Sequence, residues 1–120
     1  MADITIRAAY ASVVEDDEDG LLFIGFAEGE EEDEPYCLFR QPIGGGPVWF
    51  EVSDEDFGAE NAVERIALHE TGLEISIRVA DAAKFGWATS ISVLIGPDTE
   101  DADQALTALA EMMGSTFVAA

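Results

Sequence analysis

The segment 62–79, which reads AVERIALHETGLEISIRV, alternates apolar and polar residues on both sides of a short break. Alternation with a period of two is typical of β-strands that bury one face. A tight turn at residues 71–72 predicts an antiparallel hairpin in which Leu68 pairs with Ile75. The chain is therefore expected to build a sheet with one covered face.

The same hairpin register places Arg65 opposite Arg78 on the other face. Like charges directly across a ladder destabilise a sheet, so a carboxylate is expected between the two arginines. Glu51 is the candidate, because it shares the outward face of the predicted strand 48–53 with Trp49.

The rest of the chain gives five more strands and two helices. The predicted strands are 4–14, 21–27 (covered on both faces), 36–41, 48–53 and, last in the chain, 87–96. A short helix is predicted over 80–86, and a longer one over 97–114 with Asp98 as N-cap and Gly114 at its end. The predicted fold is α+β: residues 1–120 form a single domain, with a curved antiparallel sheet of about six or seven strands packed by the C-terminal helix and the short helix.

Charge restricts the classes of partner. Acidic residues outnumber basic ones 26 to 5, and the formal net charge is −21. Nucleic acid and anionic membranes would be repelled, so we expect neither as a partner, whereas a cationic protein would be attracted. Cys37 is the single cysteine, and no segment resembles a signal peptide or a membrane span. We expect a cytoplasmic protein.

The sequence does not indicate an enzyme, a metal site or a cofactor. A calcium loop that begins at Glu15 would have Gly20 in the sixth place but Phe26 where the bidentate glutamate belongs. One histidine and one cysteine cannot supply a typical zinc site. The PIGGGP loop precedes a strand and lacks the lysine of a phosphate-binding loop. We therefore expect no catalytic residue and no metal ligand.

Two acidic groups are the candidate partner-binding residues. The run EGEEEDEP forms a predicted loop before the strand 36–41, and its candidate residues are Glu30, Glu31, Glu32, Asp33 and Glu34. The second group combines aromatic residues with acids, as interface hot spots often do: Trp49, Glu51 and Phe57 with Asp54, Glu55 and Asp56. The alternatives are that the first loop is merely solvated and that Trp49 and Phe57 belong to the core.

In its order of segments, the sequence resembles the immunity protein 10 family, which is encoded beside polymorphic toxins in bacteria. The matching pieces are VVEDDEDGLLFIGFAE, YCLFRQ, WFEV followed by FGAENAVERIALHETGLEISI, and AAKFGW before the C-terminal helix. Two pieces depart from the family pattern, PIGGGP and the glycine-poor FGAEN. The resemblance implies an immunity protein that binds and neutralises a cognate toxin without chemistry of its own.

Other readings stay open at this stage. An acidic protein could mimic nucleic acid and inhibit a DNA-binding protein, which predicts carboxylates spaced along an elongated face. A salt-adapted organism could use the same acids only for solvation of a small structural or ligand-carrier domain. The toxin itself need not be a nuclease.

Overall fold

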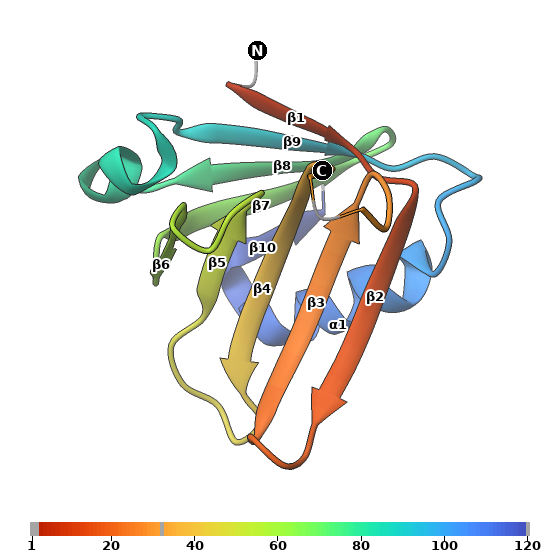
Figure 1. Ribbon diagram of the computed structural model, residues 1–120, viewed down its shortest axis with the longest axis horizontal. Coiled ribbons are helices and arrows are strands. Elements are labelled where there is room, and N and C mark those ends of the chain that lie inside the picture. Colours follow the sequence, from red (N-terminus) through yellow and green to blue (C-terminus); the bar gives the residue numbers. More distant parts are fainter. Residues whose placement is uncertain (1–2, 32, 120) are drawn as a thin grey trace.

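The computed structural model describes residues 3–31 and 33–119, which form ten strands in two sheets, one α-helix and two short 3₁₀ helices (Figure 1). The mixed sheet has the order β1 (Ile4–Arg7), β9 (Ser90–Leu94), β8 (Gly72–Ile77), β7 (Val63–His69) and β10 (Phe117–Ala119). The meander sheet has the order β2 (Tyr10–Asp16), β3 (Leu21–Ala27), β4 (Tyr36–Pro42), β5 (Trp49–Val52) and β6 (Gly58–Glu60). The α+β class is confirmed, but the single antiparallel sheet of about six or seven strands is wrong. The described residues form ten strands in two sheets, and β1–β9 and β10–β7 are parallel pairs.

The predicted strand 4–14 is two strands that belong to different sheets. The amide of Ala8 still donates to Leu94 of the mixed sheet (3.0 Å), whereas the amide of Ala9 donates to Ala27 of the meander sheet (2.8 Å). The chain therefore changes sheets at Ala8–Ala9. After the break the buried positions change phase, from Ile6 and Ala8 to Ala11.

The hairpin β7–β8 forms, but its predicted register is wrong by two residues. Leu68 pairs with Leu73, and His69 with Gly72, so the turn is at Glu70–Thr71. The shift keeps the same apolar face because the side-chain period is two. The position of Gly72 explains the shift: its φ is +138°, and a Cβ there would collide with the backbone oxygen of Val93 in β9.

The predicted charge conflict in this hairpin is absent. Arg65 lies opposite Ser76, next to a register irregularity between Val63 and Arg65, and not opposite Arg78. Strand β3 is also less covered than predicted, since Ile24 and Phe26 are buried while Phe23 on its other face is half-buried.

The helices confirm part of the prediction. The short helix is η1 (Val79–Phe85), and Gly86 closes it in the left-handed conformation. The long helix is α1 (Ala102–Met113), with Gly114 after it and η2 (Gly114–Thr116) next. The predicted N-cap is wrong: Asp101 occupies that place, because residues 99–100 are bonded to the chain beside β2.

The core lies between the two sheets and α1. Figure 1 shows α1 behind the meander sheet, where it packs against β2 and β3. Phe39, Phe50 and Phe85 stack in the centre, with ring centroids 4.7 Å and 5.8 Å apart. The inner face of the meander sheet is therefore covered, and the face turned toward the viewer in Figure 1 carries no helix.

Candidate partner-binding surface

Two acidic loops lie at the same end of the meander sheet. They are the β3–β4 loop, residues 28–35, and the β5–β6 loop, residues 53–57, and both follow strands that run in the same direction. The amide of Ser53 donates to the backbone oxygen of Tyr36 (2.9 Å), so the starts of β4 and of the second loop are directly bonded. The fold thus brings together two acidic groups that are about twenty residues apart in the sequence.

The β3–β4 loop is held by its own carboxylates. Glu28 Oε2 accepts a hydrogen bond from the amide of Arg7 (2.8 Å), which ties the loop to the end of β1. The carboxylate of Glu34 packs over Gly29 and accepts from the amide of Glu31 (3.3 Å). These bonds give the loop a defined shape.

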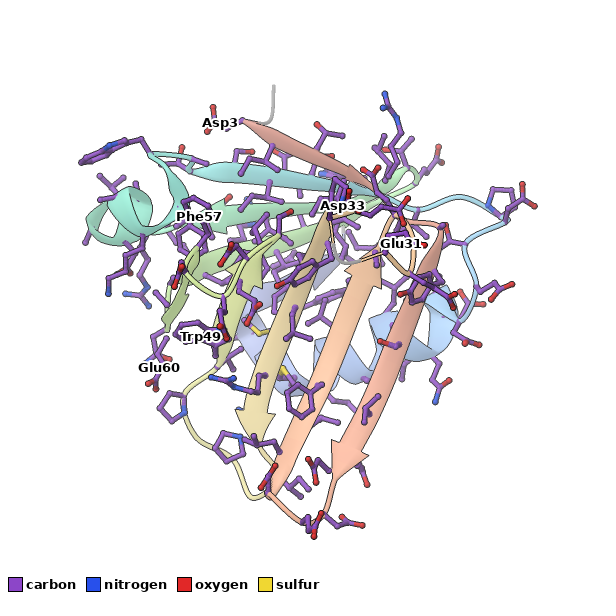
Figure 2. All side chains as sticks on the ribbon, viewed as in Figure 1. Asp3, Glu31, Asp33, Trp49, Phe57 and Glu60 are labelled. Atoms are coloured by element: carbon purple, nitrogen blue, oxygen red, sulfur yellow. The ribbon has the colours of Figure 1, made fainter. Side chains whose placement is uncertain are left out.

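Three of the predicted contact residues in this loop present free side chains. Glu30, Glu31 and Asp33 are exposed, and Figure 2 labels the last two at this end of the sheet. Glu34 is half-buried because of the bond within the loop. Glu32 lies outside the described residues.

The β5–β6 loop carries three more exposed carboxylates and an exposed aromatic ring. Asp54 Oδ1 accepts a hydrogen bond from the amide of Asp56 (2.8 Å), and the amide of Phe57 donates to the backbone oxygen of Asp54 (3.0 Å), which closes the turn. Asp54, Glu55 and Asp56 are exposed, and Phe57 is 47% exposed. The alternative that Phe57 belongs to the core is therefore wrong.

Glu51 joins the aromatic residues of the sheet. It is only 6% exposed, and its two carboxylate oxygens accept from the Tyr36 hydroxyl and from Trp49 Nε1 (2.8 Å). Its expected position between Arg65 and Arg78 is wrong, since both oxygens bind donors of the meander sheet.

The environment of Glu51 also affects the pKa of Tyr36. Its pKa is raised, mainly because the phenol is partly buried, and further by the hydrogen bond to Glu51 and the negative charges of Glu51, Asp54 and Glu55. The Tyr36 hydroxyl therefore remains a donor to Glu51 across the neutral range.

The uncovered face of the meander sheet, called here the outer face, is apolar and aromatic. One cross-strand row runs from Val14 through Phe23 and Arg40 to Trp49, and the next includes Leu38 and Glu51. Val14 is 51% exposed, and Phe23, Leu38 and Trp49 are half-buried. The Arg40 guanidinium lies over the Trp49 ring, 5.1 Å from its centroid. Trp49 is thus a surface residue, which excludes the alternative that it is core.

The acidic charges are not neutralised within the molecule. Across residues 3–31 and 33–119, the only contact within 4 Å between a basic and an acidic side chain joins His69 Nε2 to Glu74 Oε2 at 3.8 Å. Arg40, the basic residue of the outer face, contacts an aromatic ring instead of a carboxylate. The loops therefore keep a strong negative potential that an external cation can meet.

The structure bears on metal binding and on the reactivity of Cys37. In its described part, no three His, Cys, Asp or Glu side chains gather in a way that could hold a metal ion. Cys37 is fully buried in β4, and burial raises the pKa of its thiol to about 12. A thiol in that state is not a nucleophile at neutral pH.

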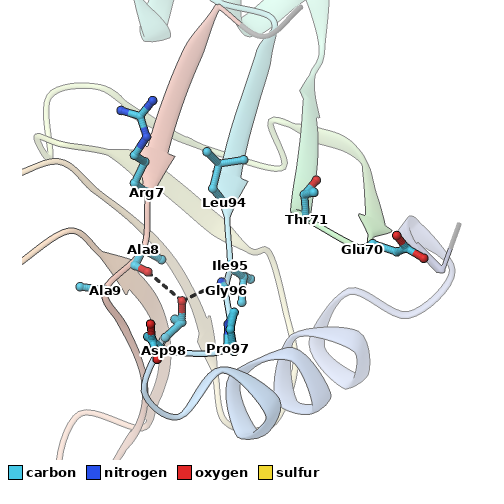
Figure 3. Close-up of a pocket in the computed structure, with 11 residues that line it drawn as sticks. Arg7, Ala8, Ala9, Glu70, Thr71, Leu94, Ile95, Gly96, Pro97 and Asp98 are labelled. Atoms are coloured by element: carbon cyan, nitrogen blue, oxygen red, sulfur yellow. Dashed lines mark hydrogen bonds between the residues drawn. The ribbon is translucent and has the colours of Figure 1, made fainter.

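A pocket of about 670 Å³ is a groove at the junction of the two sheets (Figure 3). Its lining runs from Arg7 past the β7–β8 turn to Thr99. Thr99 Oγ1 accepts from the amide of Gly96 (3.0 Å) and donates to the oxygen of Ala8 (2.8 Å). These two hydrogen bonds of Thr99 fix the chain at Ala8, where it changes sheets. The pocket lining contains neither a histidine nor a cysteine.

Sequence reasoning missed the outer-face partners Tyr36, Leu38 and Arg40. A signal was present, because these three residues alternate with the buried Cys37 and Phe39. The alternation within residues 36–42 alone therefore indicates that the sheet has one covered and one uncovered face.

Within the described residues, no helix is long and apolar enough to cross a membrane. No protein-family model, no curated protein and no solved structure matches the chain.

Proposed function

We propose that this chain is an immunity-type inhibitor that binds a cognate, cationic bacterial toxin and neutralises it without performing chemistry. The observation that carries the proposal is the juxtaposition of the uncovered aromatic outer face with two acidic loops at one end of the same sheet. The toxin as the partner is suggested by the resemblance to the immunity protein 10 family.

The two parts of the surface would contribute differently to binding. Half-buried aromatics on rigid strands, above all Trp49, supply apolar area for burial at little entropic cost, which is typical of interface hot spots. Exposed carboxylates at Glu30, Glu31 and Asp33 attract the partner from a distance and raise the association rate, to about 10⁸ M⁻¹s⁻¹ or more at low salt. Affinity should thus depend on the outer face, and association rate on the loops.

The nucleic-acid mimic is a less favoured alternative. It requires carboxylates spaced along an elongated face, whereas the molecule measures 38 × 35 × 31 Å and is nearly isometric. The two candidate acidic loops gather at one end of a sheet.

The direct test is co-expression with the product of the neighbouring reading frame. If that product is a toxin, the chain should restore growth, and the two purified proteins should form a stable complex. A neighbouring toxin that still kills in the presence of this chain, or a chain that turns over a substrate alone, would exclude the proposal.

The surface is tested by two charge-matched triple variants. Glu30→Lys, Glu31→Lys and Asp33→Lys change the β3–β4 loop; Asp17→Lys, Glu18→Lys and Asp19→Lys make the same charge change in the turn at the opposite end of the sheet. Stopped-flow association should slow at least tenfold for the first set and much less for the second. Equal slowing of both would mean that only net charge matters.

A further inference from the structure

A small apolar pocket lies beside the β5–β6 loop. It has a volume of about 230 Å³ and is lined by Ile4, Val52, Ser53, Phe57, Phe85 and Gly86. Val52 and Phe85 are buried core residues and form its base, whereas the exposed ring of Phe57 forms a wall. Figure 2 labels Phe57 at this place, between β5 and η1.

Acidic residues adjoin the lining residues in sequence at two places. Asp54, Glu55 and Asp56 lie between the lining residues Ser53 and Phe57, and all three are exposed. Asp3 precedes the lining residue Ile4, and its Oδ2 is fixed by the amides of Thr89 (2.9 Å) and Ser90 (3.3 Å). One cation, Lys84, adjoins the lining residues in sequence, and it does not line the pocket.

The shape and charge of this pocket select the chemistry of its occupant. Its volume is below the roughly 300–1,000 Å³ of pockets that hold whole small molecules, so it suits one side chain. An anion would be repelled by the carboxylates, and a purely apolar group would leave them without a partner. Lysine and arginine combine an apolar stem with a charged head, and their heads also bind aromatic rings such as that of Phe57.

We infer that this pocket receives a lysine or arginine side chain of a partner protein, with the stem against Val52 and Phe85 and the charged head at Asp54–Asp56. The identity of the partner rests on the proposed function, but the selectivity of the pocket does not. It gives the acidic end a defined anchor point in addition to its long-range field.

The selectivity can be measured without a toxin by titrating the protein with n-pentylammonium, 1-pentanol and pentanoate. Methyl and aromatic NMR shifts of Ile4, Val52 and Phe85 report on the pocket. We expect saturable shifts with n-pentylammonium, at least about tenfold weaker binding of 1-pentanol, and none of pentanoate, because the cation adds ion-pair and cation–π contacts. Equal binding of the alcohol, or ammonium shifts confined to residues 28–35, would overturn the inference.

Two variants test separately the contacts of the apolar stem and those of the charged head of the bound side chain. Phe57→Ala removes an exposed wall and should abolish the shifts while the protein stays folded. Asp54→Asn with Glu55→Gln and Asp56→Asn should make n-pentylammonium and 1-pentanol bind equally. The control, Asp17→Asn with Glu18→Gln and Asp19→Asn, removes the same charge elsewhere and should keep the preference. If the control loses it too, the preference comes from net charge and the inference fails. Failure of toxin rescue with intact selectivity would refute only the proposed function.

Discussion

Tyr36→Phe tests whether hydrogen bonds hold the buried carboxylate of Glu51. The substitution removes one hydroxyl and leaves Glu51 Oε2 without its donor. A hydrogen bond to a charged group contributes about 1.5–3 kcal/mol, and because Tyr36 is only half-buried, water can partly replace it. We therefore expect the free energy of unfolding at neutral pH to fall by about 1.5 kcal/mol, measured by urea unfolding followed by tryptophan fluorescence.

The pH dependence provides a second, independent readout. The pKa of Tyr36 is raised in the folded protein, so the folded state holds the phenolic proton more tightly than the unfolded state does. This contribution to stability is complete below the ordinary tyrosine pKa of about 10 and is lost as the pH rises above it. The slope cannot exceed about 1.4 kcal/mol per pH unit, and solvent around the half-buried ring should keep it lower. The difference between the wild type and Tyr36→Phe should therefore shrink above pH about 10.

Tyr10→Phe is the matched control. The Tyr10 hydroxyl donates to the neutral backbone oxygen of Gly29 at 3.3 Å, so its loss should cost less than about 1 kcal/mol. If Tyr36→Phe unfolds at the same urea concentration as the wild type and shows the same pH dependence, Glu51 is not held by this bond and the reasoning is refuted.

Three further results are expected. Gly72→Ala should destabilise the protein by about 3 kcal/mol in urea unfolding, because the new Cβ meets the Val93 backbone oxygen at a positive φ, whereas Gly44→Ala, in open space, should stay within about 0.5 kcal/mol. Cys37 should resist thiol reagents in the native protein and react fully in denaturing urea; rapid native labelling would contradict its burial and its pKa of about 12. The melting temperature should rise by several degrees when the ionic strength increases from about 0.01 to 0.15 M, because screening reduces the self-repulsion of a −21 charge; a protein that stays unfolded until molar salt would instead support salt adaptation.

Much of the meander sheet could be predicted from local pattern. The apolar runs 21–27 and 36–41 are separated by acids, glycines and prolines, which form turns under almost any tertiary arrangement. The end of α1 at Gly114 and of η1 at Gly86 follows from the same local chemistry, since glycine adopts the positive φ that ends a helix.

The edges of the mixed sheet could not be predicted, because β1 and β10 pair with strands that are distant in the sequence. Ile4 pairs with Ile91 and Phe117 with Ile66, and neither pairing leaves a local signal. The break at Ala8–Ala9 has no glycine or proline to mark it. The register of β7–β8 is set by the approach of β9 to Gly72, which the hairpin sequence alone does not contain.

The candidate surface was predictable in composition but not in geometry. The acids of both loops follow from the sequence, whereas the sequence left open whether Phe57 is exposed or belongs to the core. The sequestration of Glu51 does not, because it requires Tyr36 and Trp49 from two neighbouring strands to converge on one carboxylate.

The parallel pairs at the edges of the mixed sheet have a consequence for biosynthesis. Strand β1 emerges early from the ribosome, but its neighbour β9 follows only after the whole meander has been synthesised, and β10 comes later still. During translation the meander sheet can therefore assemble first, while β1, which contains Ile4 and Ile6, still lacks its partner strand β9. Shortening the chain before Phe117 would leave the edge of β7 that β10 covers, at Ile66–Leu68, without a partner strand, and such nascent chains should associate with one another.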